Sequence, residues 1–307
     1  MSILYFSIVS VPWRINIYVL NRYIYSMQDQ KVAIVTGSSS GIGFETSLTL
    51  ARNGFHTYAT MRNLEGEKSK PMTEAAKNEN LQLQVIELDV DNDKSVIDAI
   101  NTIVEERKRI DVLINNAGYA LGGALEDSSM DEIKAQFETN FFGAVRAMKA
   151  VLPVMRRQGA GKVVNITSMG GRISVPLSSS YHGSKFALEG LSESIQYELD
   201  PFGVKVILIE PGAVGSNFWK NIRIAKSSSD SNSPYSQFGN KILKAFKEME
   251  ENVISPSVVA QVVLEAVISD NPQLRYIVGE DASKTIEARK NISDKEFGNL
   301  IKKQFGI

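Results

Sequence analysis

The sequence predicts an α/β fold in which a doubly wound parallel sheet is flanked by helices on both faces. Two observations lead to this prediction: short apolar segments with the composition of buried strands recur along the chain, and amphipathic helical segments separate them. The strand segments are apolar almost without interruption, which is typical of a parallel sheet buried on both faces. Because the sequence contains neither an internal repeat nor an interdomain linker, we expect a single domain.

The first expected strand is Lys31–Thr36, whose sequence KVAIVT is followed by a glycine turn and a helix that ends at Gly54. Further strands are expected at His56–Thr60, Leu83–Leu88, Val112–Asn115, Lys162–Thr167, Val204–Glu210 and Arg275–Val278. Between them, apolar residues recur at helical spacing in two stripes: Val96, Ile97, Ile100, Ile103 and Val104, and then Ile133, Phe137, Phe141, Ala144 and Met148. A helical tail is expected after Asp281.

The composition excludes several classes of function. The near balance of 34 Lys and Arg residues against 35 Asp and Glu residues gives no electrostatic reason to expect a nucleic-acid partner. The absence of Cys excludes disulfides, iron–sulfur clusters and cysteine nucleophiles. Since His56 and His182 are the only two histidines, a three-histidine metal site is excluded as well, and we expect no metal.

Residues 1–26 differ from the rest of the chain, because they contain six aromatic residues, two Arg and no acid. The longest uncharged run, Met1–Trp13, is shorter than the roughly 20 apolar residues that span a bilayer. It also lacks the basic start and the cleavage site of a signal peptide, although a weak interfacial anchor remains an alternative. Met27 is followed by a polar segment and then the first strand. We therefore expect a non-native or weakly ordered extension at 1–26, a domain at 27–307, no transmembrane span and a cytoplasmic location.

The glycine turn after the first strand is the first motif that indicates chemistry. Gly37 fits a tight turn, Gly41 lets the backbone approach a pyrophosphate, and Gly43 lets the helix pack closely on the strand. The start of the following helix offers free N–H groups and the positive end of a dipole to phosphates. The turn therefore predicts a dinucleotide site that also includes Ser38, Ser40 and Ile42.

The same segment also matches the G-x-S-x-G pattern of serine hydrolases, with Ser39 as the nucleophile. Such a Ser needs a base His late in the chain, and no His follows His182, so we disfavour this alternative. Esterase activity abolished by Ser39→Ala would support it. A third alternative is a non-catalytic NADP-binding regulatory protein.

The end of the second strand indicates which dinucleotide is bound. An acid at this point usually holds a free ribose 2′-hydroxyl, whereas a 2′-phosphate needs a cation. No acid occurs between Phe55 and Leu64, and Arg62 supplies a cation. Ser38 and Ser40 offer hydroxyl donors nearby. The sequence therefore predicts NADP rather than NAD.

The residues with catalytic potential follow the later strands. Ser168 closes the strand Lys162–Thr167, and Tyr181 and Lys185 are four apart, so that they share one helix face. A Lys ammonium near a Tyr favours the phenolate and lowers the phenol pKa toward the range useful for acid–base catalysis. Asn140 lies within an apolar stripe, where it either bonds a backbone group or bends the helix and holds a water molecule.

With these motifs in this order, the chain resembles the short-chain dehydrogenase/reductase family from about Gln30 to Ala282. The resemblance depends on Thr36–Gly43, Asn140, Ser168, Tyr181 with Lys185, and the strand-end motifs Asn115-Asn116-Ala117-Gly118 and Pro211-Gly212. It implies a Rossmann-type sheet, a nicotinamide cofactor and redox chemistry between a carbonyl and an alcohol. The strand Arg275–Gly279 and the Met61-Arg62 pair are similar to NADP-preferring members that act on steroids and retinoids.

The resemblance also implies a role for each residue. Tyr181 would be the general acid in reduction, Lys185 would tune it and bind the nicotinamide ribose, and Ser168 would orient the substrate carbonyl. Asn140 would anchor a proton-relay water. The implied cofactor contacts include the adenine-binding Asp89 and Val90, the strand-end residues Asn116, Ala117, Gly118, Pro211 and Gly212, and the carboxamide-binding Val214 and Ser216, which is often Thr in the family.

The substrate is expected to be a ketone, an aldehyde or a secondary alcohol, covered by a segment at about 213–240. Phe218, Trp219, Tyr235 and Phe238 are candidates for an apolar lining, and the Ser-rich stretch Ser227–Pro234 is expected to be mobile. We expect His182 to point away from the site rather than to act as a base. The family also implies a homodimer or homotetramer formed through the helices of Asn140 and Tyr181.

Overall fold

The computed structural model describes residues 30–64, 69–216, 221–249 and 253–307. Within this part, the residues from Lys31 onward form one compact unit. The expected extension at 1–26, and Phe218 and Trp219 of the covering segment, lie outside the described residues. A bilayer-spanning helix is absent from the described part of the chain, since none of its helices combines the needed length with an apolar sequence.

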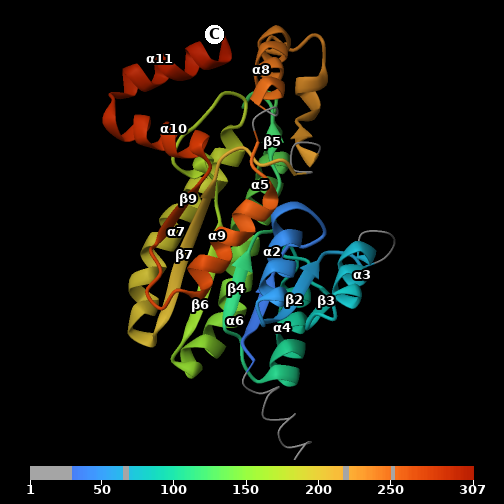
Figure 1. The fold of residues 1–307 in the computed structure, drawn as a ribbon. Coiled ribbons are helices and arrows are strands. Elements are labelled where there is room, and N and C mark those ends of the chain that lie inside the picture. The colour runs from blue at the N-terminus through green and yellow to red at the C-terminus, as the bar shows by residue number, and fades with distance from the viewer. Residues whose placement is uncertain (1–29, 65–68, 217–220, 250–252) are drawn as a thin grey trace, which may run out of the picture. The chain divides into compact units, whose positions relative to one another are not determined.

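The core of the fold is a seven-stranded parallel sheet (Figure 1) with the strand order β3-β2-β1-β4-β6-β7-β9. The strands are β1 (Val32–Val35), β2 (His56–Met61), β3 (Leu83–Glu87), β4 (Val112–Asn115), β6 (Gly161–Ile166), β7 (Val204–Pro211) and β9 (Arg275–Val278). The chain reverses its direction of travel between β1 and β4, which creates the switch point where doubly wound sheets bind ligands. The predicted fold class is confirmed, and each expected strand agrees to within two residues at either end.

The residues of each strand alternate between two apolar cores, one on each face of the sheet. In β1, Val32 and Ile34 face the core beneath α4, α6 and α7, whereas Ala33 and Val35 face the core beneath α2 and α9. All four side chains are fully buried. This burial on both faces explains why the strands lack the polar alternation of a half-exposed sheet.

Helices cover both faces, and their bounds are α2 (Gly41–Arg52), α3 (Lys70–Asn78), α4 (Asp93–Arg107), α5 (Met130–Phe137), α6 (Gly143–Gln158), α7 (Ser179–Leu199), α8 (Ser236–Met249), α9 (Pro256–Ile268), α10 (Glu280–Asn291) and α11 (Asp294–Phe305). The expected helical tail is therefore two helices. Short 3₁₀ turns lie at Met169–Gly171, Asp200–Phe202 and Lys226–Ser229.

The apolar stripe from Ile133 to Met148 does not form one uniform α-helix. A π-helical turn, Glu138–Phe142, joins α5 to α6 and carries Asn140 at its centre. Single π-turns of this kind bend a helix and often occur at functional sites. The 3.6-residue periodicity predicted the helix. A single turn with one additional residue changes the spacing of the apolar residues too little to be predicted from the sequence.

The covering segment and the tail form a small layer of their own beyond the carboxyl ends of the strands (Figure 1). The strand β8 (Arg223–Ile224) pairs with β5 (Leu121–Gly122), and α8 follows it. A third apolar cluster joins α8 and α11 to the turn after β6 through Ile173, Ile242, Phe297, Ile301 and Phe305. The tail therefore packs directly on the segment expected to cover a substrate.

Candidate active site

The glycine turn after β1 is shaped by positions that tolerate only glycine. Gly37 and Gly41 have positive φ angles of 68° and 60°. A Cβ on Gly43 would lie 2.4 Å from both the Asn116 amide nitrogen and the Gly37 carbonyl oxygen. The start of α2 can therefore lie close to β1 and β4 only because these three residues carry no side chain.

A hydrogen-bonded latch joins this turn to the end of β4. The Thr36 hydroxyl accepts hydrogen bonds from the backbone N–H groups of Asn116 and Ala117 at 3.0 and 3.1 Å. The Asn116 side chain donates to the carbonyl oxygens of Thr36 and Gly37 at 2.9 and 3.0 Å. Asn116 thus shapes the turn through its side chain, a role that a sequence motif alone does not show.

The beginning of α2 fits the pyrophosphate of a dinucleotide. Ser40 occupies the N-cap, and among the described residues neither a capping bond from its side chain nor an acid in the first turn competes for the N–H groups of the helix. Ile42 is half-buried beside this turn and packs against the core beneath α2 and α9. The donor set is therefore the one that an anionic phosphate group requires.

Ser38 has an internal role instead of the expected one. Its side chain is fully buried, its hydroxyl donates to Val35 O at 2.9 Å, and it accepts from the Ser47 hydroxyl at 3.0 Å. Its backbone N–H donates to Thr60 O at 2.9 Å. The residue therefore fastens the turn to β1 and β2, and the expected cofactor contact of its hydroxyl stays a prediction.

The ends of β2 and β3 lie on the adenine side of the switch point. Arg62 directly follows β2 and is exposed, and its charge lowers the pKa of Asp91, which burial raises. Asp89 is half-buried and Val90 is buried. A Cβ on Gly143 would lie 2.8 Å from the Val90 side chain, so α6 packs directly on this residue.

Ser168 and Tyr181 are brought together by the turn after β6. The Ser168 Oγ accepts a hydrogen bond from Gly170 N at 3.0 Å and is also bonded to the Tyr181 phenol. Burial raises the pKa of Tyr181, and the bond with Ser168 opposes this effect. Burial is therefore the largest influence on the Tyr181 pKa, and the lowering expected from Lys185 stays a prediction.

Lys185 lies one helical turn after Tyr181, and its side chain is buried. Its Nζ donates to the carbonyl oxygen of Ile166 at 2.8 Å and lies 5.9 Å from the centre of the Tyr181 ring. Burial lowers the pKa of Lys185 to about 8, against the opposing effect of the Glu189 carboxylate. The ammonium is thus held beneath the phenol by the last carbonyl group of β6.

Asn140 connects three segments of the site. Its Oδ1 accepts from Tyr119 N at 3.0 Å, and its Nδ2 donates to Tyr119 O at 3.0 Å and to the Ser184 hydroxyl at 3.2 Å. A Cβ on Gly118 would lie 3.1 Å from Asn140 Oδ1. Both interpretations from the sequence bear on this residue, since Asn140 bonds backbone groups and lies in a bent part of the helix.

His182 fastens the turn that carries Ser168, and its ring packs edge-on against that of Tyr181, with 5.7 Å between the ring centres. Its Nε2 accepts from Val175 N at 3.0 Å, so that Nδ1 carries the proton and donates to Gly170 O at 2.8 Å. Burial lowers its pKa, which keeps the ring neutral. The expectation that His182 is not the base agrees with these two bonds.

The end of β7 depends on a residue that the sequence analysis missed. Gly212 follows Pro211, and a Cβ there would lie 2.2 Å from the carboxylate oxygens of Asp281. Asp281 also accepts a hydrogen bond from Ala213 N at 2.7 Å. Its place in the first turn of α10 was the only available signal, and that position is equally typical of a plain helix-dipole partner.

The segment after Gly212 leads back to the glycine turn. Val214 is buried and forms an isolated bridge with Ile254. A Cβ on Gly41 would lie 3.0 Å from the Ser216 side chain. Ser216 is therefore close to the N-terminus of α2, as a residue that contacts a cofactor bound there must be.

The Ser-rich stretch of the covering segment is anchored rather than free. Asp127 accepts hydrogen bonds from the hydroxyl groups of Ser228 and Ser233 at 3.0 and 2.9 Å. Tyr235 donates to Glu126 at 2.9 Å, and Phe238 packs against the apolar cluster of α8 and α11. Tyr235 and Phe238, the two described candidates for the pocket lining, therefore have structural partners. The hydrogen bonds of Ser228 and Ser233 to Asp127 oppose the mobility expected for 227–234.

Comparison with known proteins identifies relatives over most of the chain. The family model of the short chain dehydrogenases matches residues 31–227. A 3-ketodihydrosphingosine reductase from Bacteroides thetaiotaomicron is 38% identical over 82% of this chain and 89% of its own length. Retinol dehydrogenase 8 from Bos taurus is also 38% identical, over 80% of each chain.

Solved structures give the same relationship. A short-chain dehydrogenase from Streptomyces avermitilis aligns with a TM-score of 0.77 and 30% identity, covering 91% of this chain and 99% of its own. A variant of actinorhodin polyketide ketoreductase, solved with NADPH, aligns with a TM-score of 0.71 and 26% identity over 83% of this chain and 97% of its own.

Proposed function

This chain belongs to the short-chain dehydrogenase family of oxidoreductases, and we propose that it transfers a hydride between NADP(H) and a ketone, an aldehyde or a secondary alcohol. The observation that carries this proposal is the convergence of Ser168, Tyr181, Lys185 and Asn140 at the carboxyl ends of β4 and β6, next to the glycine turn. These are the groups that a carbonyl reduction needs beside a nicotinamide cofactor.

In the reductive direction, Tyr181 acts as the general acid. When bound, the nicotinamide supplies the hydride, and negative charge develops on the substrate oxygen. The Tyr181 phenol donates its proton to that oxygen, while the Ser168 hydroxyl orients and stabilises it. A raised phenol pKa suits this direction, because the proton is present at neutral pH. In oxidation, the same residue accepts the proton.

Lys185 and Asn140 support this proton transfer. The buried Lys185 ammonium lies on the same helix face as Tyr181, where it favours the phenolate left after donation. Lys185 also binds the nicotinamide ribose in this proposal. Asn140, held in the π-turn, anchors a water molecule that returns a proton to the site.

The proposed cofactor contacts follow the carboxyl edge of the sheet from β1 to β7. The phosphates bind at Gly37, Ser40, Gly41, Ile42 and Gly43. The adenine lies against Asp89 and Val90, and the ribose and the nicotinamide lie along Asn116, Ala117, Gly118, Pro211, Gly212, Val214 and Ser216. Arg62, exposed at the end of β2 in a stretch without acids, favours NADP(H) over NAD(H).

The relatives indicate which carbonyl compounds to test first. One relative is named as a reductase of 3-ketodihydrosphingosine and another as a dehydrogenase of retinol. We propose a lipophilic substrate of this kind, entering beneath the layer formed by α8 and α11. The homo-oligomeric state and the cytoplasmic location remain part of the same proposal.

The decisive experiment follows NADPH absorbance with a panel of ketones, aldehydes, steroids, retinal, 3-ketodihydrosphingosine and acyl thioesters. With an accepted substrate, Tyr181→Phe should lower kcat by at least about a hundredfold, because the general acid is lost, while NADPH binding stays within about twofold. Ser39→Ala is the matched control, and it should remain active. Full activity of Tyr181→Phe would refute the mechanism, and an esterase activity that Ser39→Ala abolishes would favour the hydrolase alternative.

A further inference from the structure

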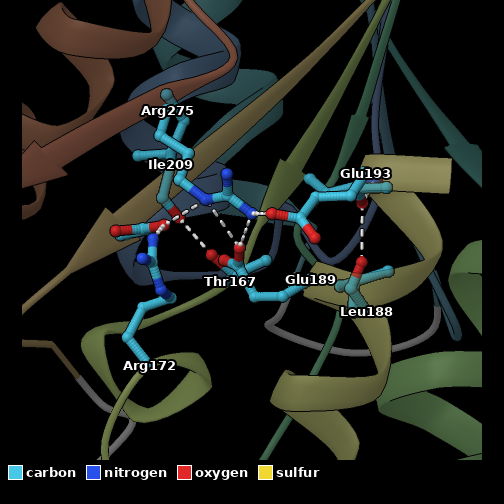
Figure 2. Close-up of polar contacts among 10 residues, drawn as sticks. Thr167, Arg172, Leu188, Glu189, Glu193, Ile209 and Arg275 are labelled. Atoms are coloured by element: carbon cyan, nitrogen blue, oxygen red, sulfur yellow. Dashed lines mark hydrogen bonds and ion pairs between the residues drawn. The ribbon is translucent and has the colours of Figure 1, made fainter. Parts of the chain in front are cut away.

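A buried ionic cluster (Figure 2) contains Arg172 and Glu189, which follow Ser168 and Lys185 by four residues each, and the proposed mechanism does not use it. It joins α7, β7, β9 and the turn after β6. Glu210 is fully buried and Glu189 is 5% exposed. Charged groups are rarely buried to this extent without a strong reason, because removing them from water costs several kcal/mol per ion.

Arg275, on the last strand of the sheet, closes this cluster. Its guanidinium lies 3.0 Å from a carboxylate oxygen of Glu189, 3.0 Å from one of Glu210 and 2.6 Å from one of Glu193 (Figure 2). The other cation is Arg172, which donates to Glu210 at 2.9 Å. Arg172 belongs to the turn that follows Ser168, so the cluster connects that turn to α7.

Glu189 lies close both to Lys185 along α7 and to the turn that follows Ser168. It lies one helical turn after Lys185, on the same face of α7. A Cβ on Gly171 would lie 2.9 Å from the Glu189 side chain, so the turn after Ser168 packs directly on it. Thr167, the residue before Ser168, lies between the Glu189 carboxylate and the carbonyl oxygen of Ile209 (Figure 2).

The charges of the cluster are balanced only when Lys185 is included. Glu189, Glu193 and Glu210 supply three carboxylates, against two guanidinium groups from Arg172 and Arg275. The Lys185 ammonium supplies the third positive charge from one helical turn before Glu189, where it is bonded to the Ile166 carbonyl oxygen and, within the described part of the chain, forms no direct ion pair with these carboxylates. One oxygen each of Glu189 and Glu210 is buried without a hydrogen-bond partner among the described residues, which leaves their charge available to nearby cations.

We propose that Glu189 and Arg275 are positioning residues for the catalytic set: Arg275 holds Glu189 ionised in its buried place, and the negative charge of Glu189, one helical turn away, favours the charged form of Lys185, which the Ile166 carbonyl oxygen fixes beneath Tyr181. The inference rests on the proposed function, because it assigns the cluster to the residues of that site. Burial and the neighbouring Glu210 raise the pKa of Glu189, and Arg275 counteracts both effects. Glu189 in turn raises the pKa of Lys185 against the effect of burial.

The first test measures the titration of Lys185 directly, in the full-length protein without substrate. Isotope-labelled lysine gives an NMR signal from each lysine, and Lys185→Arg identifies the signal of Lys185. Glu189→Gln keeps the shape of the side chain but removes its charge, so it should lower the Lys185 pKa by about one unit. Glu193→Gln is the matched control, because Glu193 pairs with the same Arg275 but its side chain is 54% exposed. This variant should leave the Lys185 pKa unchanged.

The second test is the pH profile of kcat. Glu189→Gln should move the alkaline limb to lower pH by the same amount, since Lys185 loses its proton earlier, whereas Glu193→Gln should not move it. Arg275→Met should act like Glu189→Gln or fail to fold, because it leaves two buried carboxylates without this cation, and Arg275→Lys should restore part of the activity.

Two results would overturn the inference: an unchanged Lys185 pKa in Glu189→Gln, or an equal shift in Glu189→Gln and Glu193→Gln. The NMR titration needs neither cofactor nor substrate, so its result does not depend on the proposed reaction. If Tyr181→Phe proves fully active, the proposed function fails regardless of the titration. If Tyr181→Phe is inactive but Lys185 titrates identically in all variants, only the positioning role fails.

Discussion

Tyr181 illustrates how a single residue can be prepared for one direction of a reaction. Its phenol is desolvated, which raises the pKa, and the Ser168 hydroxyl is its hydrogen-bond partner. Lys185 donates a hydrogen bond to Ile166 O at 2.8 Å, so the Ile166 carbonyl group, and not the phenol, fixes the position of the ammonium. In the proposed mechanism, the phenol is protonated and the Lys185 ammonium lies beneath it, which suits donation of the proton to a developing alkoxide.

A substitution of Arg62 tests the proposed preference for NADP(H) over NAD(H). Arg62→Ala should raise the KM for NADPH by about tenfold or more, because one exposed charge-assisted contact to the 2′-phosphate is lost. The KM for NADH, which lacks that phosphate, should change by less than about twofold. Steady-state kinetics with both cofactors measure the difference. Lys70→Ala is a control at another exposed cation, and equal effects of Arg62→Ala on both cofactors would contradict the assignment.

The residues of the site differ in how far the sequence predicted them. Ser168, Tyr181 and Lys185 could be predicted because their chemistry requires those residue types at a fixed spacing. Asp281 and Glu189 could not, since an acid on a helix has many ordinary uses and its partners come from distant segments. The internal bonds of Ser38 could not be predicted for the same reason, because a hydroxyl in a turn serves a ligand or the protein equally well until its partners are known.

At the level of elements, strands were easier to predict than the segments that cover the site. The five inner strands β1, β2, β4, β6 and β7 are buried almost throughout, so their apolar composition is close to decisive. The two-residue strands β5 and β8 are too short to produce a pattern. The π-turn at Glu138–Phe142 depends on packing against Ser184 and Tyr119, which local sequence does not record.

The helix α11 offers a prediction at this scale, since it stabilises the covering segment through α8. Ile301→Ala should cost about 2–5 kcal/mol of local stability, because Ile301 is buried in the cluster that α11 shares with α8. Hydrogen exchange in α8 should accelerate, and the KM of a large substrate should change more than that of NADPH.

The neighbouring Leu300 provides a control for this prediction, because its side chain is 43% exposed. Leu300→Ala should change stability by less than about 0.5 kcal/mol. If Ile301→Ala leaves hydrogen exchange in α8 unchanged, α11 does not support the covering segment.

For the whole molecule, three aromatic side chains lie exposed on α7 and on the π-turn that carries Asn140. Phe142 and Phe186 remain about half exposed, and Tyr197 is 76% exposed. Exposed aromatic side chains on neighbouring helices are typical of contact surfaces between proteins. They support the proposal of a homo-oligomer formed through these helices.

Light scattering tests the proposed assembly. Phe186→Glu should lower the measured mass toward that of one chain, because a carboxylate would be buried at the contact. Ile268→Glu is the control, since Ile268 is similarly exposed but ends α9 on the opposite face of the sheet. An oligomer that persists in Phe186→Glu, or one that dissociates equally in both variants, would place the contact elsewhere.

The position of Arg275 has a consequence for biosynthesis. β9 is the last strand of the sheet, yet its Arg275 neutralises Glu189 and Glu210, which a growing chain produces much earlier. Until β9 has been synthesised and has docked beside β7, these two carboxylates lack one of their cations. A fragment interrupted before Arg275 would thus carry every catalytic residue without their finished arrangement. The ion pairs behind the site therefore form only after the last strand has been synthesised and has joined the sheet.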